Sequence, residues 1–324
     1  MIAPAPTESG RPFRPADFAT FAEALDYAAS GACGFTFYTA RGEVAETLTF
    51  ARLREDAGRV AASFRALGLA RGDRVAILAE TNGEFARAFC GAMAAGLCPA
   101  PMPLPVAFGA RAAYNEQILR IATVAGARAV VASTEFEDWI KEATRPLDLL
   151  FCGRLDAMPD AGGEGAAVSP AAAGDLAYLQ FSSGTTGAPK GVAVTHEAMM
   201  ANLHAISAHG LKLTSADRGV SWLPLYHDMG LVGCFLAPIA SQFSADLFAT
   251  KDFVRRPLLW PELFSRNRAT ITYAPSFGYD LAVRRARGKA PEGMDLSTWR
   301  VAGIGGDMIK APTLRAFAET FGPA

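Results

Sequence analysis

The chain has 324 residues, 31 basic against 32 acidic side chains, and a hydrophobic content of 51%. This length can bury a large core in more than one lobe, and the even charge argues against a nucleic-acid-binding protein, which usually carries a basic excess. Five cysteines are scattered without a CxxC pair, which argues against a zinc site or a disulfide framework and indicates reduced thiols in a cytoplasmic protein.

The first 160 residues alternate between helical and strand patterns. Apolar residues at helical spacing predict an amphipathic helix that begins at Phe50 and ends before Gly68. Further patterns predict strands at 73–78, 97–103, 127–133 and 147–151, and helices at 83–96, 111–125 and 135–143. Strands that alternate with helices predict a parallel sheet flanked by helices.

One uncharged span, residues 88–110, is long enough to raise the question of a membrane segment. Four prolines between positions 99 and 105 would break any helix that crossed a bilayer there. The start of the chain also lacks the basic patch and apolar run of a secretion signal. We therefore expect no integral membrane association.

The alternation resumes after a segment rich in Ala, Gly and Pro. Residues 161–175 are expected to form a linker between one α/β subdomain at 1–160 and a second at 176–324. In the second subdomain the patterns predict strands at 176–183, 191–196, 219–225, 269–275 and 299–306, and helices at 197–210, 229–240, 276–286 and 310–321.

The stretch FSSGTTGAPKG, residues 181–191, joins two of these strands. Its glycines permit the backbone angles of an anion-binding turn, and its hydroxyls and Lys190 can supplement the backbone N–H groups. It is not a P-loop, because Pro189 and Gly191 stand where glycine and a hydroxyl residue are required. A dinucleotide fingerprint and a nucleophile elbow are also missing from the sequence. The stretch therefore predicts a different kind of phosphate-binding hairpin.

Three segments together resemble the adenylate-forming superfamily of acyl- and aryl-CoA synthetases, peptide-synthetase adenylation domains and luciferases. They are SSGTTGAPKG, SWLPLYHDMGLVG at 221–233 and VAGIGGDMI at 301–309. The residues of these segments, together with YAPSFGYDLAVRR at 273–285, are most similar to those of fatty acyl-AMP ligases. The resemblance implies two flavodoxin-like αβα subdomains of the large N-terminal domain of such enzymes, incomplete at the C-terminus.

The resemblance also implies roles for individual residues. The phosphates of ATP would be bound by Ser182, Ser183, Gly184, Thr185, Thr186, Gly187 and Lys190, with Thr185 or Thr186 near Mg²⁺. The fatty acid would be bound by His227, Asp228, Met229, Phe277, Gly278 and Tyr279, and adenine by Gly305, Gly306 and Asp307. Lys190 and His227 would be the catalytic side chains.

Each role has a structural alternative. His227 could be a core histidine, and Asp307 could serve the N-terminus of a helix. Apolar residues such as Met229 and Phe277 are often core residues and not the lining of a pocket.

The reaction implied is activation of a fatty acid with ATP to an acyl-adenylate, for transfer to an acyl carrier protein or to CoA. The family's ribose-binding aspartate and its adenylation lysine, carried on a small C-terminal domain, have no counterpart before Ala324, so we expect a truncated N-terminal domain. The alternative is a fragment that binds nucleotide or acyl group without turnover. A third and weaker interpretation, suggested by the Ser-Ser-Gly run, is a serine hydrolase of the amidase type. Such an enzyme needs a lysine and a second serine placed around its nucleophile, and the sequence shows no such spacing.

Overall fold

The computed structural model describes residues 12–105, 111–161, 171–182 and 189–324. Its largest sheet has six strands in the order β12-β11-β9-β10-β1-β2, in which neighbours are parallel except for the antiparallel pair β1 and β2. The strands are β1 (Gly34–Tyr38), β2 (Val44–Thr49), β9 (Arg218–Ser221), β10 (Ser244–Phe248), β11 (Ile271–Ala274) and β12 (Val301–Ile304).

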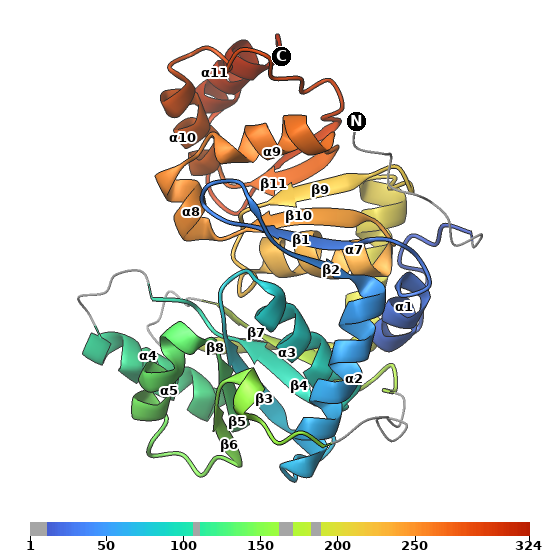
Figure 1. Ribbon diagram of the computed structural model, residues 1–324, viewed down its shortest axis with the longest axis vertical. Helices are drawn as coiled ribbons and strands as arrows, with labels where there is room; N and C mark the ends of the chain where they lie inside the picture. The colour runs from blue at the N-terminus through green and yellow to red at the C-terminus, as the bar shows by residue number, and fades with distance from the viewer. Residues whose placement is uncertain (1–11, 106–110, 162–170, 183–188) are drawn as a thin grey trace.

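A second, four-stranded sheet is wholly parallel and has the order β4-β3-β5-β6. Beside β4 lies an antiparallel pair of strands, β7 and β8. The strands of these two sheets are β3 (Arg74–Leu78), β4 (Cys98–Pro101), β5 (Ala127–Ala132), β6 (Phe151–Gly153), β7 (Leu176–Ser182) and β8 (Lys190–Thr195). Figure 1 shows the large sheet in the upper lobe and β3–β8 in the lower lobe.

Helices flank both sheets, with α9–α11 in the upper lobe and α4 and α5 on the outer side of the lower lobe (Figure 1). The α-helices are α1 (Phe21–Ala28), α2 (Phe50–Ala66), α3 (Gly83–Ala94), α4 (Arg111–Ala125), α5 (Glu137–Ala143), α6 (His196–His204), α7 (Ala237–Ala240), α8 (Thr250–Arg255), α9 (Leu259–Asn267), α10 (Ser276–Ala286) and α11 (Ala311–Phe321). Two π-helical segments, Ala205–Gly210 and Met229–Leu236, extend α6 and precede α7. In the part of the chain that is described, no helix is long and apolar enough to cross a membrane.

The predicted α/β class is confirmed, and most predicted elements agree with the structure to within a few residues. The helix expected from Phe50 is α2, and Gly68 follows it with a φ of +85°. The strand predicted at 147–151 begins too early: Leu147 lies in a turn bonded to Thr144, the first bond to the β5 region is from Leu150 to Arg128, and β6 itself covers Phe151–Gly153. The helix predicted at 229–240 is a π-helix followed by one short α-helical turn.

Among the described residues, six α-helices and strands were not predicted from the sequence: α1, β1, β2, β10, α8 and α9. Strand β1 pairs with β10 from Phe35 opposite Ala245, so strands from 1–160 contribute to the sheet of the second segment. The two proposed subdomains therefore share the large sheet, and their boundary at 161–175 stays a prediction.

An aromatic cluster fills the space between the large sheet and the helices α2 and α3. The Phe235 ring stacks on Phe35 at 5.2 Å between centroids, and the rings of Phe85 and Phe89 meet it edge-on at 5.6 Å. All four side chains are at most 1% exposed. Such pairs add to the free energy of burial, so the cluster joins the N-terminal helices firmly to the large sheet.

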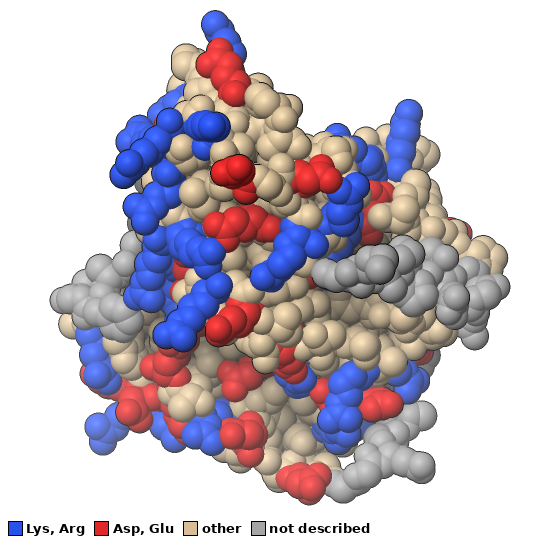
Figure 2. All heavy atoms as spheres, turned by 45° about the horizontal axis from the view of Figure 1, so that its top comes forward, with Lys and Arg blue, Asp and Glu red and all other residues tan. Residues whose placement is uncertain are grey.

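Two buried carboxylates pair with arginines near the amino end of β9 (Asp217, Arg218) and inside β10 (Asp246). The fully buried Asp246 accepts hydrogen bonds from Arg218 at 2.6 and 2.7 Å and from Asn267 at 3.0 Å. Asp217 accepts from Arg300 at 2.6 and 2.8 Å. The face shown in Figure 2 carries both acidic and basic side chains.

Candidate active site

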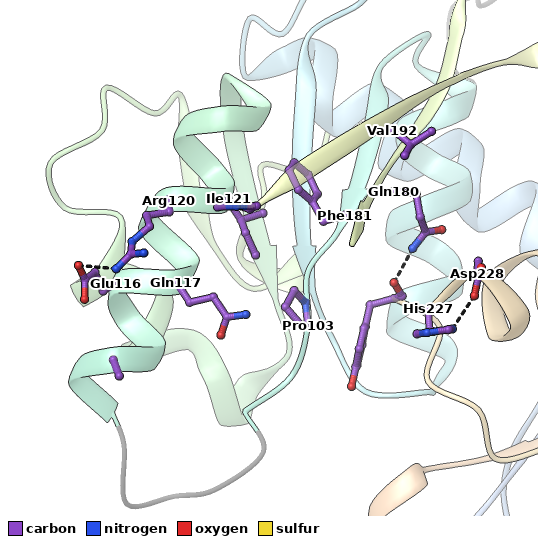
Figure 3. Close-up of a pocket in the computed structure, with 13 residues that line it drawn as sticks. Pro103, Glu116, Gln117, Arg120, Ile121, Gln180, Phe181, Val192, His227 and Asp228 are labelled. Atoms are coloured by element: carbon purple, nitrogen blue, oxygen red, sulfur yellow. Dashed lines mark hydrogen bonds and ion pairs between the residues drawn. The ribbon is translucent and has the colours of Figure 1, made fainter. Parts of the chain in front are cut away.

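A cavity of about 570 Å³ lies where the hairpin of β7 and β8, helix α4 and the loop after β9 meet (Figure 3). Ligands of open α/β sheets bind at the carboxyl ends of the strands, and the loop after β9 leaves the large sheet at that edge. The residues that line the cavity are Pro103, Ala113, Glu116, Gln117, Arg120, Ile121, Gln180, Phe181, Pro189, Val192, Tyr226, His227 and Asp228.

His227 and Asp228 stand together at the cavity. Nδ1 of His227 lies 2.6 Å from Oδ1 of Asp228, and the two side chains are 55% and 68% exposed. His227 is therefore not a core histidine. A carboxylate at Nδ1 orients the ring and leaves the other ring nitrogen for a ligand.

The loop that carries these residues is held by its own backbone. The His227 N–H donates to the Pro224 carbonyl at 3.2 Å, and the Leu231 N–H donates to the His227 carbonyl at 2.8 Å. At Gly230 an added Cβ would lie 2.2 Å from the Pro224 oxygen, so a larger residue would push the loop aside. Asp228 also accepts from the Met229 N–H at 2.7 Å, which caps the following helical segment.

Gln180 is a cavity residue that the sequence analysis missed. Its Nε2 donates to the Tyr226 carbonyl at 2.6 Å, next to His227 (Figure 3). The only sequence signal was an amide side chain inside the otherwise apolar strand LAYLQF.

The phosphate-binding stretch has the predicted hairpin geometry at its base. Strands β7 and β8 pair antiparallel, with Ser182 opposite Lys190. Lys190 is exposed at the first position of β8. Of the other residues predicted to bind phosphate or Mg²⁺, Ser183, Gly184, Thr185, Thr186 and Gly187 lie outside the described residues, as does the side chain of Ser182.

A bound metal would need ligands beyond those that the described residues offer. Within 12–105, 111–161, 171–182 and 189–324, no three His, Cys, Asp or Glu side chains gather closely enough to hold a metal ion.

The predicted adenine turn packs against the loop of His227. Gly306 has a φ of +78°, and a Cβ there would lie 3.0 Å from Cε of Met229. Asp307 accepts a hydrogen bond from the Ser276 N–H at 3.0 Å, and so satisfies a backbone donor at the N-terminus of α10. Both the turn residue and the predicted substrate residue Met229 thus lie at the same edge of the sheet.

Three residues predicted to line an acyl tunnel, Phe277, Gly278 and Tyr279, lie in the first turn of α10, directly after β11. Phe277 is 46% exposed and meets Trp222 edge-on at 5.5 Å. A Cβ at Gly278 would lie 2.5 Å from the Trp222 ring, and Tyr279 is 1% exposed with its hydroxyl donating to Gly303 at 2.8 Å. Gly278 and Tyr279 pack in the core here and are not among the described residues that line the cavity, so their binding role stays a prediction.

The cavity has two chemically different sides. The side formed by the hairpin and the loop presents an imidazole, a carboxylate and the half-buried amide of Gln180, whereas the α4 side presents the amide of Gln117 and the ion pair of Glu116 and Arg120 at 2.6 Å. These two side chains are 62% and 52% exposed. Polar groups therefore line both sides of the cavity, with the imidazole on the hairpin side and a guanidinium on the α4 side.

Comparisons with known proteins identify the family of the chain. The AMP-binding enzyme family matches residues 25–324. A provisionally named acyl-CoA synthetase of Caulobacter vibrioides is 49% identical over 98% of this chain and 55% of its own length. A long-chain-fatty-acid–AMP ligase of Mycobacterium marinum is 35% identical over 86% of this chain and 48% of its own length.

Solved structures show the same fold. A structure from a study of fatty acyl-adenylate ligases from E. coli and L. pneumophila superimposes with a TM-score of 0.90 at 41% identity, covering 96% of this chain and 56% of that one. A fatty acyl-adenylate ligase from L. pneumophila in complex with acyl adenylate and pyrophosphate gives 0.84 at 27% identity, covering 96% and 54%. The chain spans about half the length of the relatives it matches.

Proposed function

The chain belongs to the AMP-binding enzyme family, and from that membership we propose that it activates a fatty acid with ATP to an acyl-adenylate and pyrophosphate. The acceptor of the acyl group would be the phosphopantetheine arm of a carrier protein or CoA. The observation that carries the proposal is the exposed pair of His227 and Asp228 at a cavity that also contains the base of the predicted phosphate hairpin.

In this reaction a carboxylate oxygen of the fatty acid attacks the α-phosphorus of ATP. The bond from that phosphorus to the bridging oxygen breaks, and its electron pair leaves with pyrophosphate. No covalent enzyme intermediate is needed, so the side chains contribute by positioning and by stabilising charge. The ring of His227 would orient the carboxylate, and Asp228 would orient the ring.

The remaining groups would hold the nucleotide. Lys190 would neutralise the departing phosphates, together with the hydroxyls and N–H groups of residues 182–187. When bound, Mg²⁺ would supply positive charge at the phosphate oxygens, with Thr185 or Thr186 as its protein ligand. The turn of Gly305, Gly306 and Asp307 would contact adenine.

The test is mass spectrometry of the full chain after incubation with ATP, Mg²⁺ and fatty acids of graded length. We expect acyl-AMP from the wild type and a roughly 10-fold to 100-fold lower yield from Lys190→Ala, since loss of a hydrogen bond to a charged group costs about 1.5 to 3 kcal/mol. Lys289→Ala, a change at an exposed lysine after α10, is the matched control and should keep the yield. ATP binding without any product would instead support the binding-module alternative, and neither binding nor product would refute both.

A further inference from the structure

Gln180 connects two segments at the wall of the cavity that lie 46 positions apart in the sequence. Its Nε2 donates to the Tyr226 carbonyl, and Tyr226 directly precedes His227. All three residues line the cavity (Figure 3). The amide therefore links strand β7 to the loop that presents the imidazole.

Gln180 lies on the opposite face of β7 from Leu179, which is buried in the apolar core of the lower lobe. Gln180 is half-buried and faces the cavity. Oε1 of Gln180 is itself buried and accepts no hydrogen bond from the residues described. A buried acceptor without a partner costs free energy of folding, so an unpaired one calls for a reason other than stability.

We propose that Gln180 is a positioning residue that fixes the loop of His227 against β7 and so sets where His227 lies relative to Lys190. The same strand is paired with Lys190 through Ser182, two positions after Gln180. Strand β7 thus makes two contacts. It pairs through its backbone with Lys190, a predicted phosphate-binding residue, and it holds the loop of His227 through the side-chain hydrogen bond of Gln180. Groups that act on one substrate must be held in a fixed relation, which a strand does better than a free loop.

This inference rests on the proposed function for its catalytic meaning, but the link itself can be tested without a ligand. Hydrogen exchange of the wild type is compared with that of Gln180→Leu, which keeps the volume and removes the donor, and of Gln180→Glu, which cannot donate as a carboxylate. The matched control is Gln117→Leu, which removes an amide from the α4 side of the same cavity.

We expect the backbone around 224–231 to exchange about fivefold faster or more in both Gln180 variants, the factor that corresponds to losing one ordinary hydrogen bond. Gln117→Leu should exchange like the wild type in this segment. Unchanged exchange in the Gln180 variants, or equal acceleration in Gln117→Leu, would overturn the inference.

A second measurement compares the affinities for ATP and for a non-hydrolysable acyl-sulfamoyl adenosine by calorimetry on the full chain. Because His227 is placed to meet the acyl carboxyl group, Gln180→Leu should weaken the analogue about fivefold to tenfold and leave ATP within about twofold. A purely structural defect would weaken both ligands together, and that result would overturn the inference. A wild type that binds neither ligand would refute the proposed function, while the exchange comparison would still decide the role of Gln180.

Discussion

Polar residues differ between the buried part of the large sheet and its carboxyl edge. Just before β9 and inside β10, Asp217 and Asp246 are buried and paired with arginines. At the carboxyl edge, His227 and Asp228 are more than half exposed and leave hydrogen-bonding capacity open. The buried, paired carboxylates are typical of a stabilising role, whereas the exposed pair at the carboxyl edge lies where we propose that ligands bind.

The strongest test of this contrast is Asp246→Ala. The change leaves the Arg218 guanidinium without its buried carboxylate, so we expect the free energy of unfolding to fall by about 3 to 5 kcal/mol. Chemical denaturation measures the loss. Asp295→Ala, which removes an exposed carboxylate paired with Arg268, is the control and should change stability little. Equal losses in the two variants would contradict the assignment of Asp246 to a stabilising network.

A smaller effect, on binding and not on folding, is expected from His227→Ala at the carboxyl edge. Loss of a charge-assisted hydrogen bond costs about 1.5 to 3 kcal/mol, so kcat/KM for the fatty acid should fall roughly 10-fold to 100-fold. The denaturation midpoint should stay at the wild-type value, because the side chain is 55% exposed. A large drop in that midpoint would show that His227 contributes to the stability of the fold.

The contribution of Asp217 to stability should depend on pH. Burial alone would raise the pKa of Asp217, but hydrogen bonds from Arg300 and Thr270 outweigh it and hold the pKa below its usual value of 3.8. A carboxylate with a lowered pKa in the folded state stabilises the fold above that usual value, and the contribution is lost as pH falls through the folded-state pKa.

The measurement is the denaturation midpoint of the wild type and of Asp217→Asn at a series of pH values. We expect the wild type to be the more stable protein near neutral pH and the difference to shrink as the pH falls below about 4. A difference that stays constant down to low pH would show that the Asp217 carboxylate contributes nothing through its charge.

The smallest effect is expected at the α4 side of the cavity. Arg120→Gln breaks the exposed ion pair with Glu116, and pairs of this kind contribute about 0.3 to 0.5 kcal/mol. Thermal unfolding should shift by no more than a degree or two. A shift as large as that of Asp246→Ala would show that the exposed pair of Glu116 and Arg120 contributes as much to stability as the buried Asp246.

Local patterns in the sequence predicted the α/β class and the hairpin, because hydrophobic periodicity and turn residues act over short distances. They did not predict β1, whose partner β10 lies about two hundred residues away, or the edge strand β2 that pairs with β1. Nor could they pair Arg218 with Asp246 or Gln180 with Tyr226, since each contact depends on how the elements pack. His227 was found only through its motif, and its exposure at the cavity needed the structure.

The position of β1 inside the large sheet has a consequence for how the chain folds. Gly34 and Ser244 are hydrogen-bonded across 210 positions, so the six-stranded sheet has high contact order. On the ribosome, residues 34–49 must wait for β10 to be synthesised before they gain their parallel neighbour. During that interval the hairpin of β1 and β2 exposes the strand edge that β10 later covers, which is a template for pairing with other chains.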